Sequence, residues 1–215
     1  MDHKSITFTV AADLFLLLLI GVGPKVALVP FLEITADMDD ATKRRVARKM
    51  LTTAAIVSML LLVLGEVLRR LLHFSIGSLS IASGLILVII AVFMVLGSGD
   101  PEKLHDRLKG QDPMRLAVFP LGIPYVVNPA GIVALMTVSA EAASVSYFAL
   151  ALGLVAIVLA LDVVVFRWAN RVSDHLDESR MLVTEKVFGF LLAALAVQLA
   201  LDGLDGLGVI HLSGH

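Results

Sequence analysis

The chain has 215 residues, of which 58% are hydrophobic and 17% charged, and its formal net charge is −2. This composition excludes a water-soluble globular domain and a basic nucleic-acid-binding protein, and it is typical of an integral membrane protein. The apolar runs are continuous and show no period-two alternation, which favours helices over a β-barrel. We therefore expect an all-α membrane protein.

Six stretches approach or exceed the roughly 20 apolar residues that a helix needs to cross a bilayer. In chain order they predict transmembrane helices at residues 6–32, 46–68, 76–96, 116–140, 142–161 and 183–201.

The first predicted crossing is interrupted by the segment Gly21-Val-Gly-Pro-Lys25. Proline removes a backbone donor and clashes with the preceding turn, so the helix should break there. Gly23, Pro24 and Lys25 are therefore candidate substrate-binding residues. Asp13, earlier in the same crossing, is either an acid at the membrane interface or a carboxylate that couples transport to protons.

The third predicted crossing carries a series of small residues, which let membrane helices approach one another closely. We expect this face to pack against a helix rather than to bind a ligand. The residues are Gly77, Ser80, Ala82, Ser83 and Gly84.

The fourth predicted crossing, residues 116–140, contains three prolines and no Asp, Glu, Lys, Arg or His. The segment from Tyr125 to Gly131 should interrupt the helix near half depth. Broken backbone at membrane depth is tolerated only where it is buried in protein or lines a polar cavity. Asn128, Pro129 and Gly131 are therefore further candidates for binding a substrate.

The last two crossings contain two isolated polar residues, Asp162 and Gln198. Asp162 is expected at the inner end of the fifth crossing, paired with a nearby arginine; alternatively, it faces a cavity and couples transport to an ion. A glutamine in lipid is costly, so Gln198 should face the bundle, bond another helix and contribute to the site. The six histidines show no ligand spacing, so we expect no metal site and no cofactor.

The two halves of the chain resemble each other at an offset of 105 residues, which relates Pro24 to Pro129 and Gly84 to Gly189. Three crossings in each half would invert the second copy relative to the first. We predict two inverted three-helix repeats, residues 1–97 and 114–215, joined by a cytoplasmic linker at residues 98–113.

Lysines and arginines are distributed unevenly between the predicted connections. Those after crossings one, three and five carry 5, 4 and 4 of them, 13 in all, whereas the N-terminus and the other connections carry only Lys4, Arg69 and Arg70. Because positive residues concentrate on the cytoplasmic side, both termini are predicted to lie outside the cytoplasm.

Several segments carry a family resemblance: Thr42-Lys-Arg-Arg-Val-Ala-Arg-Lys, Leu64-Gly-Glu66, Ile81-Ala-Ser-Gly84, Phe119-Pro-Leu-Gly-Ile-Pro124 and Gly189-Phe-Leu-Leu-Ala-Ala-Leu-Ala-Val-Gln198. Together they resemble the MarC family, also called the neutral amino acid transporter family. The resemblance implies six crossings in two inverted halves, a prokaryotic cytoplasmic (inner) membrane and, for some members, transport of small neutral amino acids.

The two breaks depart from the pattern of that family. This chain has Gly23-Pro24-Lys25-Val26 where members usually carry Asp-Pro-x-Gly, and Asn128-Pro129-Ala130-Gly131 where they usually carry Gly-Pro-Gly. Losing the acid and gaining Lys25 makes the predicted site more positive than the family pattern.

The expected function is therefore a transporter of small amino acids or related metabolites. Half-helices that begin at Pro24 and Pro129 would turn the positive ends of their dipoles toward an anionic oxygen of the substrate. Lys25 would then face the cavity, or else it would extend its ammonium group toward the membrane surface or pair with an internal acid such as Asp162. Its expected partners are the lipid bilayer, a small-molecule substrate and, as an open option, further copies of the chain, with no nucleic acid.

Two alternatives stay open at this point. A membrane scaffold or regulatory protein would need no broken helices. An intramembrane enzyme would need a nucleophile beside a base, and the serines and threonines here have no neighbouring histidine at depth, so no enzymatic activity is expected.

Overall fold

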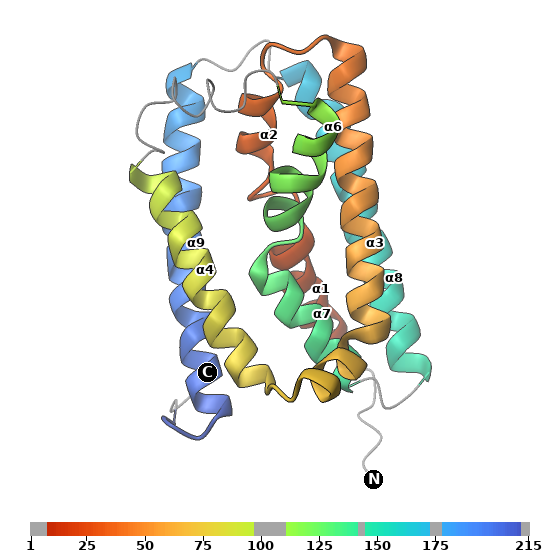
Figure 1. Cartoon of the computed structure of the whole chain (residues 1–215), viewed down its shortest axis with the longest axis vertical. Coiled ribbons are helices and arrows are strands. Elements are labelled where there is room, and N and C mark those ends of the chain that lie inside the picture. The colour runs from red at the N-terminus through yellow and green to blue at the C-terminus, as the bar shows by residue number, and fades with distance from the viewer. Residues whose placement is uncertain (1–7, 97–110, 142–144, 173–177, 212–215) are drawn as a thin grey trace.

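The computed structural model describes residues 8–96, 111–141, 145–172 and 178–211, and every regular element in these ranges is helical (Figure 1). The predicted all-α class is therefore confirmed. The elements are α1 (Phe8–Val22), α2 (Leu28–Ile34), α3 (Asp40–Leu72), α4 (Ile76–Leu96), α6 (Pro113–Leu116), η1 (Ala117–Val126), α7 (Pro129–Glu141), α8 (Val145–Val172) and α9 (Glu178–Gly206).

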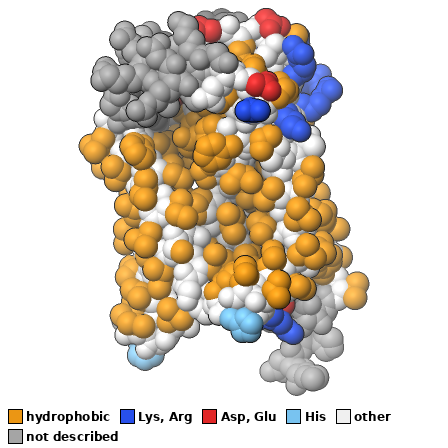
Figure 2. All heavy atoms as spheres, in the orientation of Figure 1, with side chains coloured by type: hydrophobic (Ala, Val, Ile, Leu, Met, Phe, Trp, Pro, Cys, Tyr) orange, Lys and Arg blue, Asp and Glu red, His pale blue; other side chains and the backbone are white. Residues whose placement is uncertain are grey.

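Four of these helices are long and apolar enough to cross a membrane: α3, α4, residues 145–169 of α8 and residues 186–206 of α9. A fifth span results if Pro113–Val126 and Pro129–Ala140, which are bent by 68° to each other, are counted together. α1 and α2 have 15 and 7 residues, so each falls short of a span by itself. Figure 2 shows the matching surface on one face, with hydrophobic side chains over the middle and charged side chains toward the ends.

Helix starts and ends follow local sequence signals. Asp39 caps α3 by accepting hydrogen bonds from the backbone N–H of Ala41 and Thr42, and Asp112 caps α6 by accepting one from Met114. Such caps satisfy backbone donors that have no partner in the first turn. At the other end of α3, His73 adopts a left-handed conformation with φ 56°, which terminates the helix.

The helices form a bundle and a separate pair (Figure 1). α1, α2, α3, η1, α7 and α8 share one hydrophobic cluster, whereas α4 and α9 lie side by side along their length. A second hydrophobic cluster joins this pair to Val26, Ala130 and Val133, which lie in or beside the two helix breaks. In Figure 1, α1, α2, α4 and α8 run upward and α3, α7 and α9 run downward, so α1 begins and α9 ends at the same end of the molecule.

α4 and α9 approach so closely that glycine is required at their contact. A Cβ atom on Gly84 would lie 2.7 Å from the carbonyl oxygen of Ala196, and one on Gly77 would lie 2.8 Å from that of Gly203. The predicted packing role of the small residues of the third crossing is therefore confirmed for these glycines. Ala82 differs, because its side chain is exposed on the opposite face of α4.

The predicted end of the fifth crossing at residue 161 is wrong, because α8 continues to Val172. The buried face of the helix also continues, since Phe166 and Ala169 are both in the core. Asp162 is therefore fully buried within a helix rather than placed at its end, and neither of its carboxylate oxygens has a partner among the described residues. One acid does not end a helix whose neighbours on both sides still bury apolar surface.

The α4–α9 contact gives a direct test of glycine packing. Gly84→Leu should lower the melting temperature of the detergent-solubilised protein by several degrees, because overpacking a close contact costs about 1–3 kcal/mol. Gly153→Leu in α8 is the matched control, since a Cβ atom there meets nothing within 4 Å. Both changes raise helix propensity equally, so equal melting temperatures for the two variants would contradict the contact.

Candidate functional site at the two helix breaks

The first break separates α1 from α2 over residues 23–27. Leu28 donates its backbone N–H to the carbonyl oxygen of Pro24 at 2.9 Å, which starts α2. Gly23, Val26 and Ala27 are buried, Pro24 is half-buried and Lys25 is exposed. The predicted break at Gly23-Pro24-Lys25 is therefore present.

The second break lies at Val127 and Asn128, between η1 and α7. The helix before it is already distorted, because Phe119 and Ile123 have extended backbone angles (φ −138° and −136°). Each of them precedes a proline, and the proline ring disfavours helical angles in the residue before it. The predicted interruption from Tyr125 to Gly131 is confirmed, and the distortion begins earlier, at Phe119.

The two breaks meet and satisfy each other's backbone groups. Asn128 donates its backbone N–H to the carbonyl oxygen of Gly21 at 3.0 Å and its side-chain Nδ2 to that of Ile20 at 2.8 Å. Its Oδ1 accepts the backbone N–H of Gly131 at 3.0 Å, which caps α7. Two of the last carbonyls of α1 and an early N–H of α7 are thus paired by Asn128. We call these residues, Ile20, Gly21, Asn128 and Gly131, the break junction.

The backbones in the break junction are in contact without any side chain between them. A Cβ atom on Gly131 would lie 2.1 Å from the carbonyl oxygen of Gly21, and a Cβ atom on Gly21 would lie 2.3 Å from Cα of Gly131. No side chain fits at such a distance, so both positions require glycine. Gly131 was a candidate from sequence, whereas Gly21 was not.

Three of the predicted site residues therefore have a structural position in or beside the break junction: Asn128, Pro129 and Gly131, all buried. Substrate binding by them, and by Gly23, Pro24 and Lys25, stays a prediction. The alternative pairing of Lys25 with Asp162 is wrong, because both carboxylate oxygens of Asp162 lack a hydrogen-bond partner in the described structure.

Gln198 differs from the expectation that it would bond another helix. Its Nε2 donates to Oδ1 of Asp202, one turn further along α9, at 2.7 Å, and its side chain is half-buried. Among the described elements, α9 makes its broad contact with α4. The one side-chain hydrogen bond described for this amide thus lies within its own helix.

Two predicted acids lie outside the break junction. Asp162 is buried in α8, and Asp13 lies on α1 with a side chain outside the described part. The described residues contain no group of three His, Asp or Glu side chains that could hold a metal ion.

Two features were missed from sequence. A glycine before a proline break is common, and only the partner across the contact shows that Gly21 cannot carry a side chain. The pairing of Asn128 with α1 spans 108 residues, and no local pattern encodes it.

Several helices are long and apolar enough to cross a membrane, and two interrupted helices meet at the break junction. These features define a multi-pass helical membrane protein. The chain matches the model of the MarC family of integral membrane proteins over residues 8–207, and it belongs to that family.

Similar proteins occur in bacteria and archaea. The chain is 27% identical to the UPF0056 membrane protein YvbG of Bacillus subtilis, over 88% of this chain and 92% of the relative. It is 27% identical to the UPF0056 membrane protein YhcE of Escherichia coli, over 93% of this chain and 94% of the relative. It is 23% identical to the UPF0056 membrane protein MJ1677 of Methanocaldococcus jannaschii, over 86% of this chain and 90% of the relative. No solved structure gives a significant match.

The break junction predicts a specific loss of stability in Asn128→Ala. The change leaves the carbonyl oxygen of Ile20 and the N–H of Gly131 without partners, and each unpaired buried group costs about 1–3 kcal/mol. The melting temperature in detergent should fall by several degrees more than in the control Gln198→Ala, which removes an amide bonded within one helix. Equal losses in the two variants would show that Asn128 does not join the breaks.

Proposed function

We propose that this protein is a membrane transporter, an exporter or secondary carrier, for small amino acids or related metabolites, and that the substrate binds at the two helix breaks. The observation that carries the proposal is the break junction. Two interrupted helices that meet inside a bundle cost backbone hydrogen bonds, and carriers use such interruptions to place helix ends at a substrate. A scaffold or regulatory protein gains nothing from them.

Six crossings in two inverted three-helix repeats are part of this proposal. α1 with α2 would then correspond to α6, η1 and α7, α3 to α8, and α4 to α9. The contact of α1 with α8 has its counterpart in the contact of α7 with α3, as exchange of the halves requires. Each pair of corresponding helices runs in opposite directions in Figure 1, which supports inversion.

The chemistry around the breaks favours a substrate with a carboxylate. Lys25 is exposed beside the first break, and the central parts of α7 and α3, residues 129–140 and 50–65, contain no acid that would compete for it. A charged lysine within the membrane is energetically costly unless it faces a water-filled path or pairs with a bound anion. In this proposal the Lys25 ammonium binds the substrate carboxylate.

We further propose the orientation predicted from the positive residues, in a prokaryotic inner membrane. Blue side chains gather toward the upper end in Figure 2, where α3 begins, and this end would face the cytoplasm. Because the chain has no cysteine, single cysteines at Arg44 and Leu207 report the orientation. An impermeant maleimide should label Leu207→Cys in intact cells and Arg44→Cys only after permeabilisation; the reverse pattern would contradict the orientation.

Flux through purified protein in liposomes tests the function. Labelled alanine, glycine and glutamate are offered in turn, and at least one should show saturable uptake. Lys25→Gln should raise the KM at least about tenfold, since a hydrogen bond to a charged group contributes about 1.5–3 kcal/mol.

Lys49→Gln is the matched control for that experiment, because Lys49 is an exposed lysine near the start of α3, away from the breaks. It should keep the wild-type KM. Absence of flux for all three amino acids in folded protein would overturn the proposed function. Saturable flux with an unchanged KM in Lys25→Gln would remove Lys25 from the site.

A further inference from the structure

Asp162 is a fully buried acid in the middle of the α8 face that packs against the bundle. The buried residues of that face recur every three or four positions: Ala151, Val155, Val158, Asp162, Phe166 and Ala169. This spacing is one side of a helix. The carboxyl group therefore points at the helices that α8 contacts, which are α1, α2, α3 and α7, and not at lipid.

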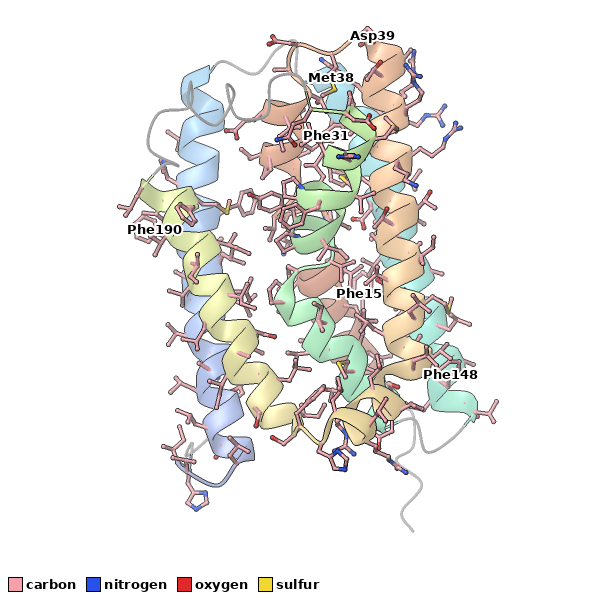
Figure 3. The ribbon with its side chains drawn as sticks, in the orientation of Figure 1. Phe15, Phe31, Met38, Asp39, Phe148 and Phe190 are labelled. Carbon is pink, nitrogen blue, oxygen red and sulfur yellow. The ribbon has the colours of Figure 1, made fainter. Side chains whose placement is uncertain are left out.

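The aromatic contact one turn further along fixes the depth of Asp162. Phe166 packs edge-on against Phe31 of α2, with ring centroids 5.2 Å apart (Figure 3 shows Phe31 within the bundle). α2 and α8 run in the same direction (Figure 1). One turn back from Phe31 is Ala27, and one turn back from Phe166 is Asp162, so the acid lies at the level of the first helix break.

Among the described residues, no charged side chain is paired with this carboxyl group. Neither oxygen has a hydrogen-bond partner among the described residues. On the elements packed against α8, residues 50–65 of α3, 129–140 of α7 and 14–22 of α1 contain no ionisable residue, while Lys25 and Glu33 are exposed. Asp13 on α1 and Glu141 at the end of α7 have side chains outside the described part.

Metal cations fit this position poorly. A hard cation takes six or more oxygen ligands, and the buried polar side chains near the bundle core are few. Thr35 is bonded to the carbonyl oxygen of Phe31, and Asn128 is bonded within the break junction. The hydroxyl of Ser58 is the other buried side-chain group without a hydrogen-bond partner in the described part of the chain. A proton needs a single oxygen.

Resting on the proposed function, we propose that Asp162 is the proton-binding site that couples transport to a proton gradient. In the buried position that the structure shows, the group is the neutral carboxylic acid. When the first break opens to water, the O–H bond ionises, the proton leaves to that compartment, and the carboxylate accepts another proton from the opposite side. An ionised carboxylate without a partner could not occupy the closed core.

Chemical labelling tests proton binding without transport. Wild-type protein in liposomes is treated with dicyclohexylcarbodiimide, an apolar reagent that modifies protonated carboxyl groups, and its peptides are mapped by mass spectrometry. The adduct should appear at Asp162 and should decrease as the pH is raised. A wild-type protein that carries no adduct at Asp162 at any pH would overturn the proposal, whatever the transport result.

Coupling is tested with Asp162→Asn, which keeps the shape of the side chain, and with Asp202→Asn as the matched control on the exposed side of α9. An imposed pH gradient should drive accumulation of alanine by the wild type and by Asp202→Asn. Asp162→Asn should lose accumulation while it still exchanges labelled for unlabelled alanine. Gradient-driven accumulation that survives in Asp162→Asn overturns the proton site and leaves the transporter intact. If the wild type moves no substrate, the proposed function fails, and labelling decides the proton site.

Discussion

Asn128 gives two N–H groups to the last carbonyls of α1 and receives one N–H from α7. These bonds matter because a helix that stops among other helices leaves backbone N–H and C=O groups without partners in its own helix. Because the two breaks lie against each other, backbone groups at the end of α1 and the start of α7 gain hydrogen-bond partners. The glycines at positions 21 and 131 make this possible, since any side chain there would hold the backbones apart.

The α4–α9 pair and the helical bundle lie on different sides of the two breaks. The α4–α9 pair is held by glycine contacts along its length and touches the breaks through Val26, Ala130 and Val133. The bundle on the other side of the breaks holds Asp162 at the same depth. Lys25 is exposed beside the first break, whereas Asp162 is buried among the bundle helices. In the proposed transporter, Lys25 binds the substrate carboxylate and Asp162 binds the proton that moves with it.

The sequence was sufficient for the features that depend on local chemistry. The positions of the prolines predicted both breaks, and the lengths of the apolar stretches predicted the long helices. The small residues predicted the packing face of α4. It was insufficient where a residue acts through a distant partner. The bond of Asn128 to Ile20, the need for Gly21 and the burial of Asp162 within α8 all depend on which helices come together. For Gln198 the sequence predicted a bond to another helix, whereas the amide donates to Asp202 within α9.

Backbone hydrogen exchange of the two breaks, followed by mass spectrometry with and without alanine, tests the central claim most directly. If the breaks satisfy each other and also bind substrate, the amides of Asn128 and Gly131 exchange slowly even without alanine. Those of the first break, residues 25–27, then exchange faster and become protected when alanine is added. Rapid exchange at Asn128 and Gly131, or a first break that is indifferent to alanine and to every other amino acid tried, would contradict the account.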